Sequence, residues 1–220
     1  MESRIGAKNV RSKPICIPVK SKRQSGNSLL EAVKMVEVRW RAWNGIGLEH
    51  CVVETNDGGM TLSGAVVGAR ETKYGAFYSV RTDELFRTRE VRVQYASGPV
   101  LHVEADGRGS WLDLVAGSSL EHLDGCIDVD IGVTPATNTL PIKRLNLSAN
   151  ESREILAAYV PLPSQIEDTF VPTRAEQRYT CIEVGKLYRY EGLFRNFTAE
   201  LEIDRAGIVL DYPDTFKRLR

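Results

Sequence analysis

The chain has 220 residues, of which 42% are hydrophobic and 26% are charged, and its 29 basic and 29 acidic residues cancel at neutral pH. A chain of this length and composition can bury a core without disulfides or metals. Zero net charge gives no long-range attraction to nucleic acid, so no nucleic-acid partner is expected. No apolar run approaches the roughly 20 residues that a membrane span needs, so the protein is not expected to be integral to a membrane.

The N-terminal segment 1–36 is rich in Lys and Arg, poor in acidic residues and without regular apolar periodicity. This composition predicts a disordered basic tail. Within it, NSLLEAVKMV suits a short helix capped by Asn27 or Ser28, which is too short to stand alone. We expect a single folded domain over residues 37–220.

The chain contains four cysteines, and no two of them form a C-x-x-C pair. The N-terminus also lacks the apolar stretch of a secretory signal. Together these features predict a cytoplasmic protein with reduced thiols, most of them buried as small hydrophobic side chains. The four residues are Cys16, Cys51, Cys126 and Cys181.

From Glu37 onward, apolar and polar residues alternate with a period of two, which is typical of half-buried β-strands. Glycine-containing turns separate these segments at hairpin spacing, and few helical stretches lie between them. The short separations leave no room for βαβ crossovers and predict an all-β, mainly antiparallel fold built as one continuous sheet. The segments are VEVRWRA, REVRVQY, PVLHVEAD, QRYTCIEV, LYRYEGLF and TAELEIDRAGIVLDYP.

Two segments fit this pattern less clearly. NESREILAAYV is compatible with a helix capped by Asn150 or with a strand that continues into VPLP. PDTFKRLR, at the end of the chain, resembles a closing helical turn with Pro213 near its start.

Common catalytic and cofactor motifs are missing from the sequence. There is no G-x-S-x-G, P-loop, H-E-x-x-H or G-x-G-x-x-G pattern. The histidines His50, His102 and His122 lie on separate segments, and their spacing does not indicate a metal site. We therefore predict neither a metal nor a cofactor.

The segment CIDVDI places Cys126, Asp128 and Asp130 on one face of an expected strand. Two carboxylates at this spacing stand about 7 Å apart and can polarise a substrate hydroxyl or hold a cation. Alternatively, they form an acidic surface stripe or pair with an arginine such as Arg144. We favour the structural interpretation, because glycosidase chemistry needs a defined carboxylate separation that a sequence does not reveal.

The following segment, TPATNTLPI, contains Pro135 and Pro141, so it cannot run as a regular central strand. Its threonines and Asn138 can cap freed backbone groups or offer hydroxyl and amide groups to a sugar. Five aromatic residues could line an apolar groove or stack on a sugar ring: Trp40, Trp43, Trp111, Tyr188 and Tyr190. Aromatic residues at strand period are, however, more often part of the core.

Several of these motifs together resemble a bacterial family described as putative glycolipid-binding proteins. They are VRWRAWNGIGLEHCVV, DGCIDVDIGVTPATNTLPIKRL, VPLP, QRYT, YRYEG and LEIDRAGIVLDYP. The resemblance runs from about Val38 to Phe216 and implies a spiral β-roll, in which a long sheet wraps around a single helix. Ala136 stands where the family pattern has a larger apolar residue, usually Phe, and Lys143 stands where it has Arg.

Three hypotheses about function follow. The first, which we favour over the other two, is non-enzymatic binding of an amphipathic ligand, a glycolipid or fatty-acyl compound, in an apolar groove with a polar rim. The second is a hydrolase or other enzyme that acts on a sugar or acyl substrate with Asp128 and Asp130 as an acid/base pair. The third is a dimeric scaffold. The predicted ligand-binding residues are Trp40, Trp43, Asp128, Asp130, Thr134, Asn138 and Arg144.

Overall fold

The computed structural model describes residues 33–220. The first strand begins at Lys34, three residues before the expected domain boundary. Most of the expected N-terminal helix, and Cys16, lie outside the described residues, and the described part of that segment, Lys34–Val36, is strand. No helix in residues 33–220 is long and apolar enough to cross a membrane.

Strands are the main regular structure of the described chain, which confirms the all-β prediction. The strands are β1 (Lys34–Ala42), β2 (Gly47–Asn56), β3 (Gly59–Gly68), β4 (Tyr74–Thr82), β5 (Thr88–Tyr95), β6 (Val100–Ala105), β7 (Trp111–Asp113), β8 (Ser118–Ser119), β9 (Asp128–Ile131), β10 (Ser152–Val160), β11 (Thr173–Glu183), β12 (Leu187–Gly192), β13 (Phe197–Glu202) and β14 (Phe216–Leu219). The described residues also form one α-helix, α1 (Thr139–Leu145), and four short 3-10 turns. The turns are η1 (Glu121–Leu123), η2 (Ala136–Asn138), η3 (Pro163–Gln165) and η4 (Leu193–Arg195).

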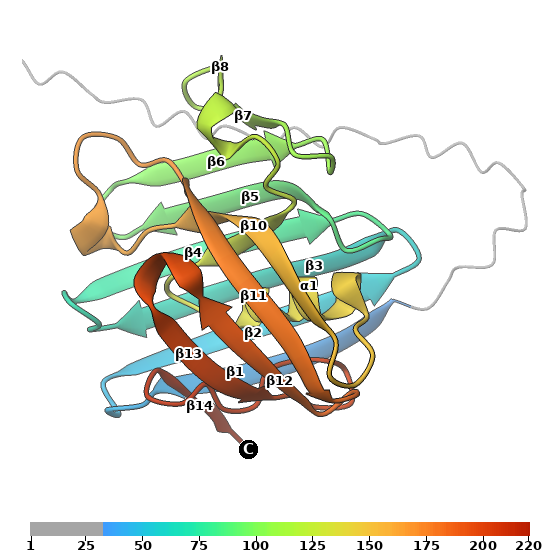
Figure 1. Cartoon of the computed structure of the whole chain (residues 1–220). Helices are drawn as coiled ribbons and strands as arrows, with labels where there is room; N and C mark the ends of the chain where they lie inside the picture. Colours follow the sequence, from blue (N-terminus) through green and yellow to red (C-terminus); the bar gives the residue numbers. More distant parts are fainter. Residues whose placement is uncertain (1–32) are drawn as a thin grey trace, which may run out of the picture. The chain divides into compact units, whose positions relative to one another are not determined.

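Hydrogen bonds divide the strands into two sheets. A nine-stranded sheet has the order β14-β1-β2-β3-β4-β5-β6-β7-β8, and a five-stranded sheet has the order β13-β12-β11-β10-β9. The five-stranded sheet lies across one face of the larger one, as Figure 1 shows. The expectation of one continuous hydrogen-bonded sheet is therefore wrong, because alternation predicts strands but does not indicate where a ladder ends.

Alternating burial explains the individual strands. In β1, Val38 and Trp40 are buried while Arg39 and Arg41 are exposed. The same pattern holds in β5 and β6, and the predicted turns at Gly58, Gly107 and Gly207 fall between strands. Each strand thus stabilises the fold by placing one face on the core and the other in water.

The prediction that no βαβ crossover fits the chain is wrong at one place. Strand β9 pairs with β10 in parallel, and α1 lies in the connection between them. A parallel pair needs a long crossover, and the proline-containing segment supplies it. Other pairings among the described strands are antiparallel.

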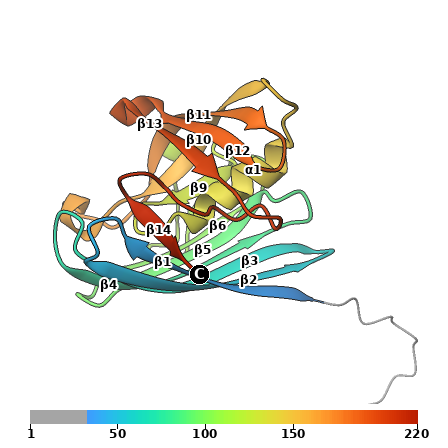
Figure 2. The same ribbon diagram turned by 90° about the horizontal axis from the view of Figure 1, so that it is seen from below.

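Helix α1 lies between the two sheets (Figure 2). Its Leu140 packs in the main core, to which both sheets contribute, whereas Ile142 packs in a second cluster with residues of the five-stranded sheet. Pro141 is tolerated because it falls in the first turn, where backbone N–H groups have no intrahelical partner. The helix ends at Leu145 because Asn146 adopts a left-handed conformation, with φ of 43°.

Both ambiguous segments are strands. NESREILAAYV forms β10, and the last residues form β14, so the expected closing helical turn is wrong. Pairing explains the second result, because β14 hydrogen bonds to β1 from Ala42–Phe216 to Arg39–Leu219. Cys51, Cys126 and Cys181 are buried and unpaired within the described chain, as predicted.

Candidate functional site

A cavity of about 240 Å³ opens where the five-stranded sheet meets β14. We call it the aromatic cleft, because six aromatic side chains line it. Neighbouring rings among them lie 5.6 to 6.4 Å apart, and their planes are tilted or perpendicular. The six are Tyr159, Tyr190, Phe194, Phe197, Tyr212 and Phe216.

Two acidic residues line the cleft, Asp130 and Glu71. The carboxylate of Glu71 accepts hydrogen bonds from Ser164 and Gln165, and that of Asp130 is the more deeply buried. Oδ2 of Asp130 accepts a hydrogen bond of 2.7 Å from Nε2 of Gln177. Burial raises the pKa of Asp130, while the hydrogen bond from Gln177 and the positive charges of Arg195 and Arg70 act in the opposite direction. The cleft therefore holds an acceptor group in an environment of low polarity.

Two guanidinium groups line the same cleft. Arg70 donates to the carbonyl of Gly132 at 2.5 Å, and its guanidinium lies 6.0 Å from the ring of Phe216. Arg195 lies 4.1 Å from the ring of Tyr159, a cation–π distance. Neither arginine forms an ion pair within residues 33–220, so both retain donors for a ligand.

A second cavity of about 140 Å³ shares Arg70, Thr215 and Phe216 with the aromatic cleft. We call it the Trp43 cavity, because Trp43 is 43% exposed at its wall. Glu49 lines the same cavity, yet only 1% of this residue is exposed. Because the two cavities share these wall residues, they lie next to each other.

Glu49 is held by two hydroxyl groups. Its Oε1 accepts hydrogen bonds from Tyr78 (2.5 Å) and Thr134 (2.6 Å), and its Oε2 has no partner in the described part of the chain. Burial raises the pKa of Glu49 to about 7, although both hydrogen bonds act to lower it. Tyr78 reaches this position because Gly64, opposite it on β3, has no side chain to collide with the ring.

The residues predicted as ligand contacts separate into two groups. Asp130 and Thr134 line the aromatic cleft, and Trp40 and Trp43 line the Trp43 cavity. Trp40 is fully buried, and its Nε1 donates to the carbonyls of Val209 and Leu210 at 3.1 Å each. Of the two tryptophans, Trp43 is the one with a face open to a ligand.

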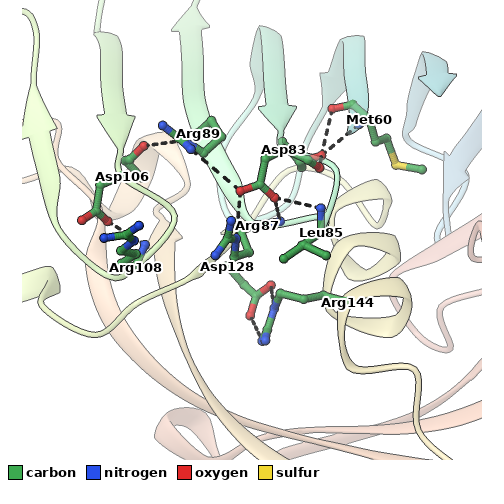
Figure 3. A network of polar contacts seen from close by, with 11 residues as sticks. Met60, Asp83, Leu85, Arg87, Arg89, Asp106, Arg108, Asp128 and Arg144 are labelled. Atoms are coloured by element: carbon green, nitrogen blue, oxygen red, sulfur yellow. Dashed lines mark hydrogen bonds and ion pairs between the residues drawn. The ribbon is translucent and has the colours of Figure 1, made fainter. Parts of the chain in front are cut away.

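Asp128, Asn138 and Arg144 line neither cavity. Asp128 is 1% exposed and binds Arg144 through two hydrogen bonds of 2.9 and 2.5 Å, which Figure 3 shows. Asn138 is buried and accepts a hydrogen bond of 2.8 Å from Tyr179. Asp128 is thus the arginine-paired carboxylate that the sequence offered as an alternative. A role of these three residues as ligand contacts stays a prediction.

Strand β9, which carries Asp128 and Asp130, differs from the prediction in one respect. Asp128 and Asp130 point away from the core in which Val129 and Ile131 pack, as alternation requires. Cys126, however, precedes the strand and packs in the same core as Val129 and Ile131. The prediction assumed a strand that begins two residues earlier than β9 does.

Sequence reasoning missed Glu49, Arg70, Arg195 and most of the cleft aromatics. Glu49 had a detectable signal, because it shares the strand parity of Cys51 and Val53 and is therefore a charged residue on an apolar face. The arginines and Tyr212 lie in turns and loops, where no periodicity marks them.

The geometry defines an all-β protein with a cleft lined by aromatic and charged side chains. Comparison with known proteins adds the family: residues 37–218 match the family described as putative glycolipid-binding, and the chain belongs to it. A crystal structure of a DUF1089 family protein from Pseudomonas aeruginosa is similar, with 31% sequence identity, a TM-score of 0.67, and coverage of 90% of this chain and 100% of that one. No curated protein sequence matches this chain.

Proposed function

We propose that this protein binds an amphipathic molecule of the glycolipid type, with the sugar head group in the aromatic cleft, and does not transform it. The observation that carries this proposal is the gathering of six aromatic rings with the carboxylates of Asp130 and Glu71 and with two arginines that have no ion-pair partner among residues 33–220. Aromatic faces pack against the apolar faces of sugar rings, while charged groups form hydrogen bonds with their hydroxyls. The family description supports the same class of ligand.

The volume of the aromatic cleft suits a head group better than a whole glycolipid. Ligand sites for drug-sized molecules occupy about 300 to 1,000 Å³. The aromatic cleft, at about 240 Å³, is smaller than that and suits one part of a larger molecule. An alkyl chain leaving the cleft would contribute about 0.8 kcal/mol per methylene that it buries against apolar surface.

The proposal is tested by titrating the full-length protein with n-octyl β-D-glucoside, n-octyl β-D-galactoside and n-octyl β-D-maltoside below their micelle concentrations. Phe197→Ala removes a cleft ring that is 36% exposed, so it should weaken binding about tenfold with little loss of stability. Phe77→Ala is the matched control, because Phe77 is 66% exposed on strand β4 and does not line the cleft. Equal binding by both variants would contradict the placement of the head group.

The same samples test for catalysis. Incubation of the protein with each octyl glycoside should release no octanol. Release of octanol that depends on Asp130 would instead favour hydrolysis, because Asp130 is the buried carboxylate in the cleft wall. Native mass spectrometry of protein purified from its own host should then identify any lipid that the protein retains.

A further inference from the structure

The proposed function does not use the buried carboxyl group of Glu49. This side chain lies in the wall of the Trp43 cavity, and its Oε1 already accepts two hydrogen bonds. Its Oε2 is buried without a partner among residues 33–220. A buried polar atom without a partner costs free energy, so a hydrogen-bonding group that reached this oxygen would be stabilised there.

We propose that Oε2 of Glu49 forms a hydrogen bond with a hydroxyl group of the bound head group, in the cavity beside Trp43. This inference rests on the proposed function and names a second contact region for the same ligand. The shared wall residues Arg70, Thr215 and Phe216 connect this cavity with the aromatic cleft. A head group can therefore extend past Phe216 toward Glu49.

A hydroxyl group suits this position better than other ligand groups. Tyr78 and Thr134 both donate to Oε1, so in the neutral acid the proton is carried by Oε2. A hydroxyl can accept from the protonated Oε2 and can donate to the ionised one, whereas an ammonium group can only donate. The exposed face of Trp43 can pack against the ring that carries the hydroxyl.

Ionised Glu49 should bind the hydroxyl more strongly, because hydrogen bonds to charged acceptors are about twice as strong as neutral ones. Since burial raises the pKa of Glu49 to about 7, the free protein holds a mixture of both states near neutrality. Ligand binding should therefore favour ionisation and release a fraction of a proton, at most about one half, for each ligand bound at pH 7. Affinity should rise about fivefold between pH 6 and pH 8.

Other groups around Glu49 do not explain such a change. Burial raises the pKa of Cys51 to about 12 and raises those of Tyr74 and Tyr78, so these three stay neutral. The remaining charged groups at the cavity or beside Cys51 are Arg70, the exposed Asp214 and Arg218. His50, the residue next to Glu49, projects to the opposite face of the sheet and does not line the cavity.

The test is calorimetric titration of the full-length protein with n-octyl β-D-glucoside at pH 6, 7 and 8. Two buffers of different ionisation enthalpy at pH 7 report proton release directly. Tetraethylene glycol monooctyl ether is the matched probe, because its head group replaces most hydroxyls by ether oxygens. Glu49→Gln is compared with Glu54→Gln, which changes an exposed glutamate of the same strand.

We expect the wild type and Glu54→Gln to release this fraction of a proton and to gain affinity with pH, and Glu49→Gln to do neither. The ether probe should bind without proton release. If octyl glucoside binds the wild type equally at pH 6 and pH 8 and no proton is released, the role of Glu49 is overturned. The proposed function would still stand. Failure of all three octyl glycosides to bind at any pH would overturn both. The proton-release measurement uses the wild type, so it does not depend on the folding of a variant.

Discussion

The buried carboxyl group of Glu49 predicts how the stability of the protein depends on pH. Burial raises the pKa of Glu49 in the folded state to about 7, whereas an ordinary glutamate has a pKa of 4.5. A group whose folded pKa is raised contributes stability that is fully present below its unfolded pKa and is lost as the pH rises through the folded pKa. The relevant window for Glu49 is therefore about pH 4.5 to 7.

The magnitude follows from the size of the pKa shift. One pKa unit corresponds to 1.36 kcal/mol, so the shift of Glu49 corresponds to about 3 kcal/mol of unfolding free energy across this window. Glu49→Gln cannot ionise and should not lose this contribution. The free energy of unfolding of the wild type, measured relative to that of Glu49→Gln, should fall by about 3 kcal/mol between pH 4.5 and pH 8.

Urea unfolding followed by tryptophan fluorescence at several pH values measures this difference. The buried Trp40 and Trp111 report loss of the core. Glu54→Gln removes an exposed carboxylate from the same strand and should follow the wild type at every pH. A constant difference between wild type and Glu49→Gln from pH 5 to pH 8 would refute the reasoning, because it would mean that Glu49 titrates alike in the folded and unfolded states.

Substitutions at four further positions test the fold around the site. Asp128→Asn should cost about 3 kcal/mol in urea unfolding, because it leaves the guanidinium of Arg144 without its carboxylate; the double variant with Arg144→Met should lose less than the sum of the single losses. Gly64→Ala should cost about 1 to 3 kcal/mol, since a methyl group there would collide with the ring of Tyr78, and an effect below about 0.5 kcal/mol would contradict that packing. Asn146→Ala should cost about 1 kcal/mol and Asn146→Gly should not, because the residue has φ of 43°; thermal unfolding of both variants distinguishes this backbone effect from loss of the amide side chain.

The strands were predictable because their information is local. Alternation of Val38 and Trp40 with Arg39 and Arg41 requires only that one face of a strand be buried. The same local reasoning failed for the division into two sheets and for the parallel pairing of β9 with β10. Both depend on which strands meet after folding, and helix α1 lies in a proline-containing segment where periodicity gives no signal.

The site was harder to predict because the chain assembles it from distant segments. Arg70 comes from the turn after β3, Asp130 from β9 and Phe216 from β14, and they share one cavity. Asp130 was a candidate because carboxylates at alternate strand positions stand out in the sequence. Phe216 has no such local mark, since an aromatic residue near a chain end looks the same whether it packs in a core or lines a cleft.

The segment from Asp128 to Arg144 connects the structural and functional roles of this region. The ion pair between its two ends fixes α1 against β9, and the chain between them contributes Asp130 and Thr134 to the cavity walls. Thr134 also donates to Glu49, so the position of this segment determines the surroundings of both carboxyl groups. A charge pair that contacts neither cavity can therefore influence binding by holding in place the side chains that do.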